Sequence, residues 1–167
     1  MQFLWRVVLL ALVVYCMRLP SIADLFKTAA PQMAAPNGVT KIYKIIPGDD
    51  PRYTSFPVPI PASHEFFLSP LDAKDGFIHL STAQQLEGTL SRFFAEAPSI
   101  GLLRCDYERI STWKKIKWEE SGSGLFPHLY GSNLEGEMVE AFRFVDKPTD
   151  QTWGQVLQKL KDERWLL

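Results

Sequence analysis

Cysteine is nearly absent from this chain. Cys16 lies close to the N-terminus, and Cys105 is the only cysteine in the remainder of the sequence. A disulfide within the folded domain is therefore excluded, and no C-x-x-C motif for metal or redox chemistry occurs. Cys105 follows the apolar pair Leu102 and Leu103, so we expect it to be a buried strand residue.

The sequence also has no charge excess and no common catalytic signature. Its 18 basic and 19 acidic residues give a net charge of −1, which provides no evidence for nucleic acid as a partner. There is no G-x-S-x-G elbow, P-loop or H-E-x-x-H motif. The spacing of the three histidines, His64, His79 and His128, matches no common zinc pattern, so no metal site is predicted.

One long hydrophobic run is present, at the N-terminus. Residues 3–17 are apolar except for Arg6, and a run of about 15 residues is short for crossing a bilayer. We predict a hydrophobic leader over residues 1–26, a linker rich in alanine and proline over 27–38, and a single domain over 39–167. The leader fits a secretory signal cleaved near Ala23, a mitochondrial presequence, or a short anchor that contacts a membrane through residues 3–17. The secretory pathway or membrane attachment is favoured, with the mitochondrion as the alternative.

The domain alternates strand and helix patterns, which predicts an α+β fold with helices against a mixed or antiparallel sheet. The proline-rich segment 47–70 is predicted to be irregular. Ser81 with Gln84 has the pattern of a capping box that opens a helix, and a second amphipathic helix is expected from Trp153. Strands are expected at residues 39–46, 76–80, 100–105, 116–119, 126–130 and 138–145.

Two short apolar runs each contain a histidine followed by hydroxyl groups. His79 precedes Ser81, and His128 precedes Tyr130, each by two residues, so each pair would face one side of its strand. If the strands are neighbours, these four side chains meet in one cleft. Thr82, at the expected helix start, would leave backbone N–H groups free for a phosphate. The alternative is that both histidines are hydrogen-bonded core residues.

Several segments resemble the family called domain of unknown function 952. The resemblance covers about residues 39–146, although the proline-rich stretch 47–61 departs from the family pattern. The segments that carry it are Lys41-Ile42-Tyr43-Lys44-Ile45, Asp75-Gly76-Phe77-Ile78-His79-Leu80-Ser81-Thr82, Lys117-Trp118-Glu119 and Phe126-Pro127-His128-Leu129-Tyr130-Gly131.

This resemblance implies a fold similar to that of ADP-ribosyltransferases, in which a split sheet holds NAD in a central cleft. His79 would then contact a ribose hydroxyl, and His128 or Tyr130 would lie near the nicotinamide. Glu119 would be the acid that assists catalysis, although a carboxylate at this position is also compatible with a solvated strand end. Ser81 and Thr82 complete the expected cofactor contacts.

Three functions are compatible with these features. The first is an ADP-ribosyltransferase-like enzyme that uses NAD, with His79, His128 and Glu119 as catalytic residues. The second is a domain that binds a nucleotide or other small metabolite without catalysis. The third is a structural or interaction protein that is tethered by its N-terminal segment and keeps both histidines in its core.

Overall fold

The computed structural model describes residues 33–122 and 124–167. The residues from Met33 to Leu167 form one compact unit. The predicted leader, residues 1–26, and the first part of the predicted linker lie outside the described residues. Met33 already belongs to the compact unit, because it forms an isolated β-bridge with Trp118.

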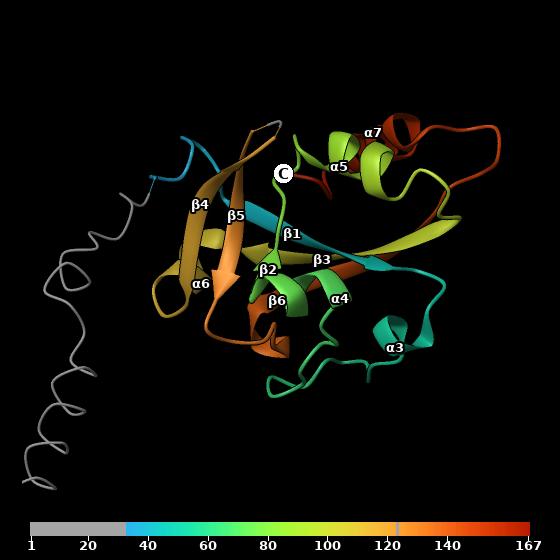
Figure 1. The fold of residues 1–167 in the computed structure, drawn as a ribbon. Helices are drawn as coiled ribbons and strands as arrows, with labels where there is room; N and C mark the ends of the chain where they lie inside the picture. Colours follow the sequence, from blue (N-terminus) through green and yellow to red (C-terminus); the bar gives the residue numbers. More distant parts are fainter. Residues whose placement is uncertain (1–32, 123) are drawn as a thin grey trace, which may run out of the picture. The chain divides into compact units, whose positions relative to one another are not determined.

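Six strands form two three-stranded sheets, and every pair of neighbouring strands is antiparallel (Figure 1). The first sheet has the order β1-β3-β6, with β1 at Lys41–Pro47, β3 at Ser99–Asp106 and β6 at Val139–Asp146. The second sheet has the order β2-β5-β4, with β2 at Phe77–His79, β4 at Lys115–Ser121 and β5 at Gly124–Tyr130.

The helices are short, and several have clear start signals. Asp50 and Ser69 accept hydrogen bonds from backbone N–H groups at the starts of α3 and α4, each of which begins with proline. Thr152 and Gln155 form a capping box at the start of α7. The helices are α3 at Pro51–Thr54, α4 at Pro70–Asp75, α5 at Leu86–Phe93, α6 at Tyr107–Ser111, a 3₁₀ turn at Gly136–Met138, and α7 at Trp153–Asp162.

The segment that follows β2 connects the two sheets. Leu80 N–H still donates to the Pro127 carbonyl of the second sheet, at 3.0 Å. One residue later, Ser81 and Tyr43 of the first sheet exchange two backbone hydrogen bonds, at 2.8 and 2.9 Å. The chain therefore passes from one sheet to the other between Leu80 and Ser81.

Two apolar clusters lie on opposite faces of the first sheet, as the alternation of side chains along a strand requires. In β1, Ile42 and Ile46 belong to a cluster that also contains Trp118 and Leu129 of the second sheet. Tyr43 and Ile45 belong to the other cluster, which includes side chains of α5 and α7. Figure 1 shows these two helices close together at one end of the sheet. The resulting layers are sheet, sheet and helix pair.

The expected α+β architecture is confirmed, and the six expected strands occur within a few residues of their predicted bounds. Both sheets are antiparallel, so the mixed alternative is wrong. Cys105 is fully buried in β3, as predicted, and burial raises the pKa of its thiol to about 12. No helix within the described part of the chain is long and apolar enough to cross a membrane.

The helix after β2 begins later than the sequence pattern predicts. Residues 82–85 form a turn in which Gln85 N–H donates to the Thr82 carbonyl, and Thr82 N–H donates to the Gln85 side chain. The α-helix then starts at Leu86. Ser81 cannot act as the cap, because its backbone is paired with β1.

The central strand of the second sheet should be sensitive to loss of volume. Leu129 is fully buried in β5 between Ile78 and Ile116 of the neighbouring strands. We expect Leu129→Ala to lower the free energy of unfolding by about 2–5 kcal/mol, because it leaves a cavity. Urea denaturation measures this, with Val58→Ala, at a site 70% exposed, as the control that should change little. Equal effects of the two substitutions would contradict the described core.

Candidate functional site

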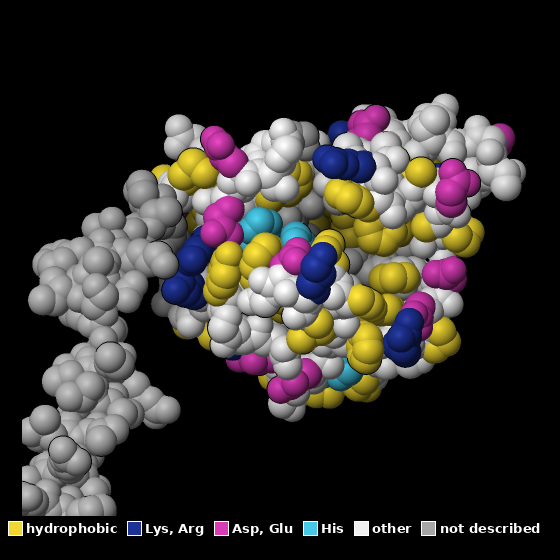
Figure 2. Space-filling model, viewed as in Figure 1, with side chains coloured by type: hydrophobic (Ala, Val, Ile, Leu, Met, Phe, Trp, Pro, Cys, Tyr) yellow, Lys and Arg dark blue, Asp and Glu magenta, His cyan; other side chains and the backbone are white. Residues whose placement is uncertain are grey.

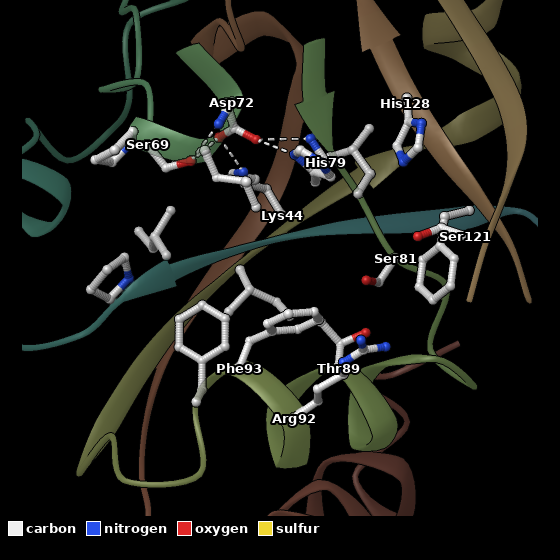
Figure 3. A pocket seen from close by; sticks show the side chains of 18 of the residues that line it. Lys44, Ser69, Asp72, His79, Ser81, Thr89, Arg92, Phe93, Ser121 and His128 are labelled. Atoms are coloured by element: carbon white, nitrogen blue, oxygen red, sulfur yellow. Dashed lines mark hydrogen bonds and ion pairs between the residues drawn. The ribbon is translucent and has the colours of Figure 1, made fainter. Parts of the chain in front are cut away.

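A cavity of about 590 Å³ opens between β1, β2 and α5. Figure 2 shows histidine side chains at the edge of a hollow that hydrophobic side chains border. The polar side chains of the lining are drawn in Figure 3. The lining residues are Lys44, Ile45, Ile46, Pro47, Tyr53, Ser69, Pro70, Leu71, Asp72, His79, Leu80, Ser81, Gly88, Thr89, Arg92, Phe93, Phe94, Ser121, Phe126 and His128.

The two strand histidines meet in this cavity. His79 of β2 and His128 of β5 are directly opposite each other in the strand register, and their ring centroids are 5.2 Å apart. Phe77, two residues before His79, packs against both rings, with centroid distances of 4.7 and 4.3 Å. Side chains on one face of an antiparallel pair pack in this way, so the pair is held by the sheet itself.

A buried carboxylate holds His79. Asp72, which is 2% exposed, accepts hydrogen bonds from the backbone N–H and the ring Nδ1 of His79, at 3.0 and 2.8 Å. Its other oxygen accepts from Lys44 Nζ at 2.5 Å and from Ser69 Oγ at 2.7 Å. Burial alone would raise the pKa of Asp72, but the hydrogen bonds from His79 and the charge of Lys44 outweigh it and hold this pKa well below its usual range.

Local sequence explains how Asp72 and His79 come together. Ser69 and Pro70 start α4, and the Ser69 hydroxyl accepts from the Asp72 N–H at 3.0 Å. Gly76 ends the helix in the left-handed conformation, with φ of 75°. The chain then turns back along α4, so that β2 begins beside the carboxylate. In addition, Asp75 Oδ2 lies 3.4 Å from His79 Nε2.

A second carboxylate holds His128. Glu119 Oε2 is 2.8 Å from His128 Nδ1 and also accepts a 2.8 Å hydrogen bond from the Tyr130 hydroxyl. Burial lowers the pKa of His128, and the Glu119 contact opposes this only in part. Burial, together with the bond to Glu119, raises the pKa of Tyr130 to about 12. When Nδ1–H of His128 donates to Glu119, Nε2 of the neutral ring is left as an acceptor.

The other expected site residues differ in whether they line the cavity. Ser81 is buried and lines the cavity on the same side as His79, as their spacing predicts. Glu119 and Tyr130 do not belong to the lining and reach the cavity only through His128. Thr82 is buried and is not part of the lining.

The backbone N–H groups of Ser81 and Thr82, near the predicted phosphate position, are both paired within the protein. The Ser81 N–H donates to the Tyr43 carbonyl at 2.9 Å, and the Thr82 N–H donates to Gln85 Oε1 at 2.9 Å. Neither backbone group is available to a ligand. The physical reason is the delayed start of α5, which leaves this segment paired within the protein.

Sequence reasoning missed three charged residues of the cavity, Lys44, Asp72 and Arg92. Lys44 carried one signal, because it has the same strand parity as the apolar residues Ile42 and Ile46. Asp72 has the pattern of an ordinary acid in the first turn of a helix after a cap. Arg92 resembles a solvated helix residue. In the described residues, no group of three or more histidine, cysteine or acidic side chains is arranged so that it could hold a metal ion.

Comparison with known proteins gives a family and one solved relative. The family model described as "Protein of unknown function (DUF952)" matches residues 60–142. The crystal structure of protein CC0527 from Caulobacter crescentus is 30% identical, with a TM-score of 0.53, over 71% of this chain and 99% of that chain. The solution structure of the same protein is 29% identical, with a TM-score of 0.52, over 74% and 95% of the two chains. No curated protein matches. The family resemblance in the motifs is confirmed, and the ADP-ribosyltransferase-like fold stays a prediction.

Removing the buried carboxylate should be costly. Asp72→Asn leaves the buried Lys44 ammonium without its counter-charge, so we expect the free energy of unfolding to fall by about 3–5 kcal/mol. Chemical denaturation measures the loss. Asp75→Asn is the matched control, since the Asp75 side chain is 32% exposed and lies 3.4 Å from His79; it should change stability far less. Similar losses in the two variants would contradict the role of Asp72.

The Asp72 carboxylate should also make the stability of the fold depend on pH in the acid range. The pKa of Asp72 is lower in the folded than in the unfolded chain, so its contribution is present above the unfolded value and is lost as pH falls toward the folded value. We expect the stability difference between wild type and Asp72→Asn to be largest near pH 7 and to shrink below about pH 4. Urea denaturation at a series of pH values tests this. A difference that stays constant down to pH 3 would refute the assignment.

Proposed function

The chain belongs to the DUF952 family, and we propose that it binds a small metabolite of the nucleotide class in its cavity. His79 and His128 contact the sugar hydroxyls of this ligand. The observation that supports the proposal is that two imidazoles, far apart in the chain, lie side by side on the wall of one open cavity. Histidines with a purely structural role are expected to be enclosed in the core and not to line an open cavity.

The hydrogen bonds of the two rings suit a vicinal diol. When Nδ1–H of each ring donates to its carboxylate, each Nε2 is an acceptor. Two imidazoles whose ring centroids are 5.2 Å apart can each contact one of the two neighbouring hydroxyls of a ribose. The Asp75 contact with His79 Nε2, at 3.4 Å, is long enough for a ligand hydroxyl to replace it.

The rest of the cavity is compatible with a nucleotide base. Its volume lies within the range of small-molecule sites, about 300–1,000 Å³. Leu71, Phe93 and Phe126 provide apolar and aromatic surface on which a planar ring can pack. NAD is the first ligand to test, since it joins two such rings to two riboses. The motif-based likeness to ADP-ribosyltransferases supports the same choice by analogy.

ADP-ribosyl transfer is a second candidate, and the Glu119–His128 contact favours it. In this reaction the bond between nicotinamide and C1′ breaks, and nicotinamide leaves with the electron pair. The oxygen of an acceptor hydroxyl forms the new bond to C1′, and its proton passes to His128 Nε2. Glu119 does not line the cavity, so its role is to orient His128 and stabilise its protonated form.

Ligand binding can be tested with a matched set of histidine variants. NAD at a hundred times its dissociation constant should stabilise the wild type by about 2.7 kcal/mol, which thermal unfolding detects as a raised melting temperature. His79→Ala and His128→Ala should lose this shift. His64→Ala is the control, because His64 packs against Phe56 and Phe66 away from the cavity and should keep the shift. A shift that survives in His79→Ala would refute the placement.

Catalysis is a separate measurement on the same proteins. Nicotinamide release from NAD should be detectable in the wild type. Glu119→Gln should lower its rate and change its pH dependence while leaving binding in place, because Glu119 acts through His128. Binding without release would remove the transferase candidate and leave the binding proposal intact.

A further inference from the structure

A glycine inside α5 borders the cavity without any structural need for glycine. Gly88 is the third residue of the helix, where glycine destabilises by about 0.5–1 kcal/mol relative to alanine. A Cβ atom placed on Gly88 would meet no atom within 4 Å. Its backbone conformation is also helical and open to any residue. Packing of the protein therefore does not explain Gly88, which is exposed and lies at the border of the cavity.

The charged side chain of Arg92 lies one helical turn after Gly88 in α5. Arg92 follows Gly88 by four residues and Thr89 by three, so the three residues share one face of α5, and all line the cavity. Figure 3 shows Thr89 and Arg92. Arg92 Cζ lies 5.1 Å from the centroid of the Phe93 ring. Its Nη1 lies beside the turn between β4 and β5, since a Cβ at Gly122 would be 3.3 Å from it. Ser121, at the end of β4, also lines the cavity.

Arg92 differs from the other cation of the cavity. The Lys44 ammonium is bound to Asp72 at 2.5 Å, and its charge is already compensated. Within residues 33–122 and 124–167, no carboxylate forms an ion pair with Arg92. A guanidinium that lines the same cavity as two hydroxyl side chains is a set of donors suited to a phosphate.

We propose that Gly88, Thr89, Arg92 and Ser121 form a subsite for the phosphate or pyrophosphate of the ligand. The phosphate lies over Gly88, where a side chain would exclude it, and Arg92 binds its oxygens, with the hydroxyls of Thr89 and Ser121 as further donors. This inference rests on the proposed function in that it assigns the second half of the same nucleotide. It replaces the phosphate position at Ser81 and Thr82 with a different element of the structure.

The experiment compares two ligands that differ only by one phosphate. Nicotinamide mononucleotide and nicotinamide riboside are titrated into the full chain by calorimetry. We expect the wild type to bind the mononucleotide at least tenfold more tightly, and Arg92→Gln to reduce this ratio below twofold. Lys161→Gln removes the same charge from an exposed position on α7 that is not part of the cavity, and should keep the wild-type ratio. A ratio that survives in Arg92→Gln, or is absent from the wild type, would overturn the subsite.

Two substitutions of Gly88 test the space itself. Gly88→Ala should fold and melt at a higher temperature, because alanine favours the helix and meets no neighbour. Gly88→Leu should also fold and should lose the preference for the mononucleotide, because the longer side chain occupies the phosphate position. If Gly88→Leu keeps that preference, the phosphate does not lie there and the proposal fails.

Pyrophosphate separates this inference from the proposed function. It should raise the melting temperature of the wild type and of His79→Ala, and have no effect on Arg92→Gln. That result, without binding of any nicotinamide compound, would refute the nucleotide proposal and retain the anion site. Equal, His79-dependent binding of both nicotinamide ligands, with no effect of pyrophosphate, would retain the binding proposal and remove the anion site.

Discussion

The buried carboxylate of Asp72 links three elements of the fold, α4, β1 and β2. Asp72 comes from α4 and accepts hydrogen bonds from β1 through Lys44 and from β2 through both the backbone and the ring of His79. A carboxylate is tolerated at this depth because donors surround it on both oxygens. The same contacts fix the orientation of His79. Asp72 therefore contributes both to the stability of the fold and to the geometry of the cavity wall.

The sequence pattern was sufficient for the strands, and it predicted that the histidines meet on the condition that β2 and β5 are neighbours, as they are in the structure. Alternation of apolar residues identified all six strands, and the two-residue spacing of His79 and Ser81 placed both on the cavity side. The motif resemblance led to the correct family. These features depend on periodicity and on short contiguous motifs, which a single sequence displays directly. The position of Tyr130 outside the lining was not predictable in this way, because it depends on how far the cavity extends along β5.

The charged residues of the cavity could not be predicted from the sequence, for a different reason. Lys44 and Asp72 are 28 positions apart, and the parity of Lys44 with Ile42 and Ile46 does not indicate its partner, which depends on how α4 packs near β1 and β2. The start of α5 depended on Gln85, whose side chain binds Thr82 N–H and the Leu125 carbonyl together. Such side-chain contacts across the fold leave no periodic trace in the sequence. Tertiary hydrogen bonds here override the local capping pattern at Ser81.

Glu119 does not line the cavity but contacts His128, which does. Its side chain is 37% exposed to bulk solvent and bonds to Nδ1 of an imidazole that is itself almost fully buried. His128 thus has one nitrogen toward the enclosed space and the other toward a water-accessible carboxylate. With the proposed ligand bound, a proton accepted on the nitrogen at the cavity could leave from the other nitrogen through Glu119. The imidazole would then connect the interior of the cavity with the surrounding medium for acid–base exchange.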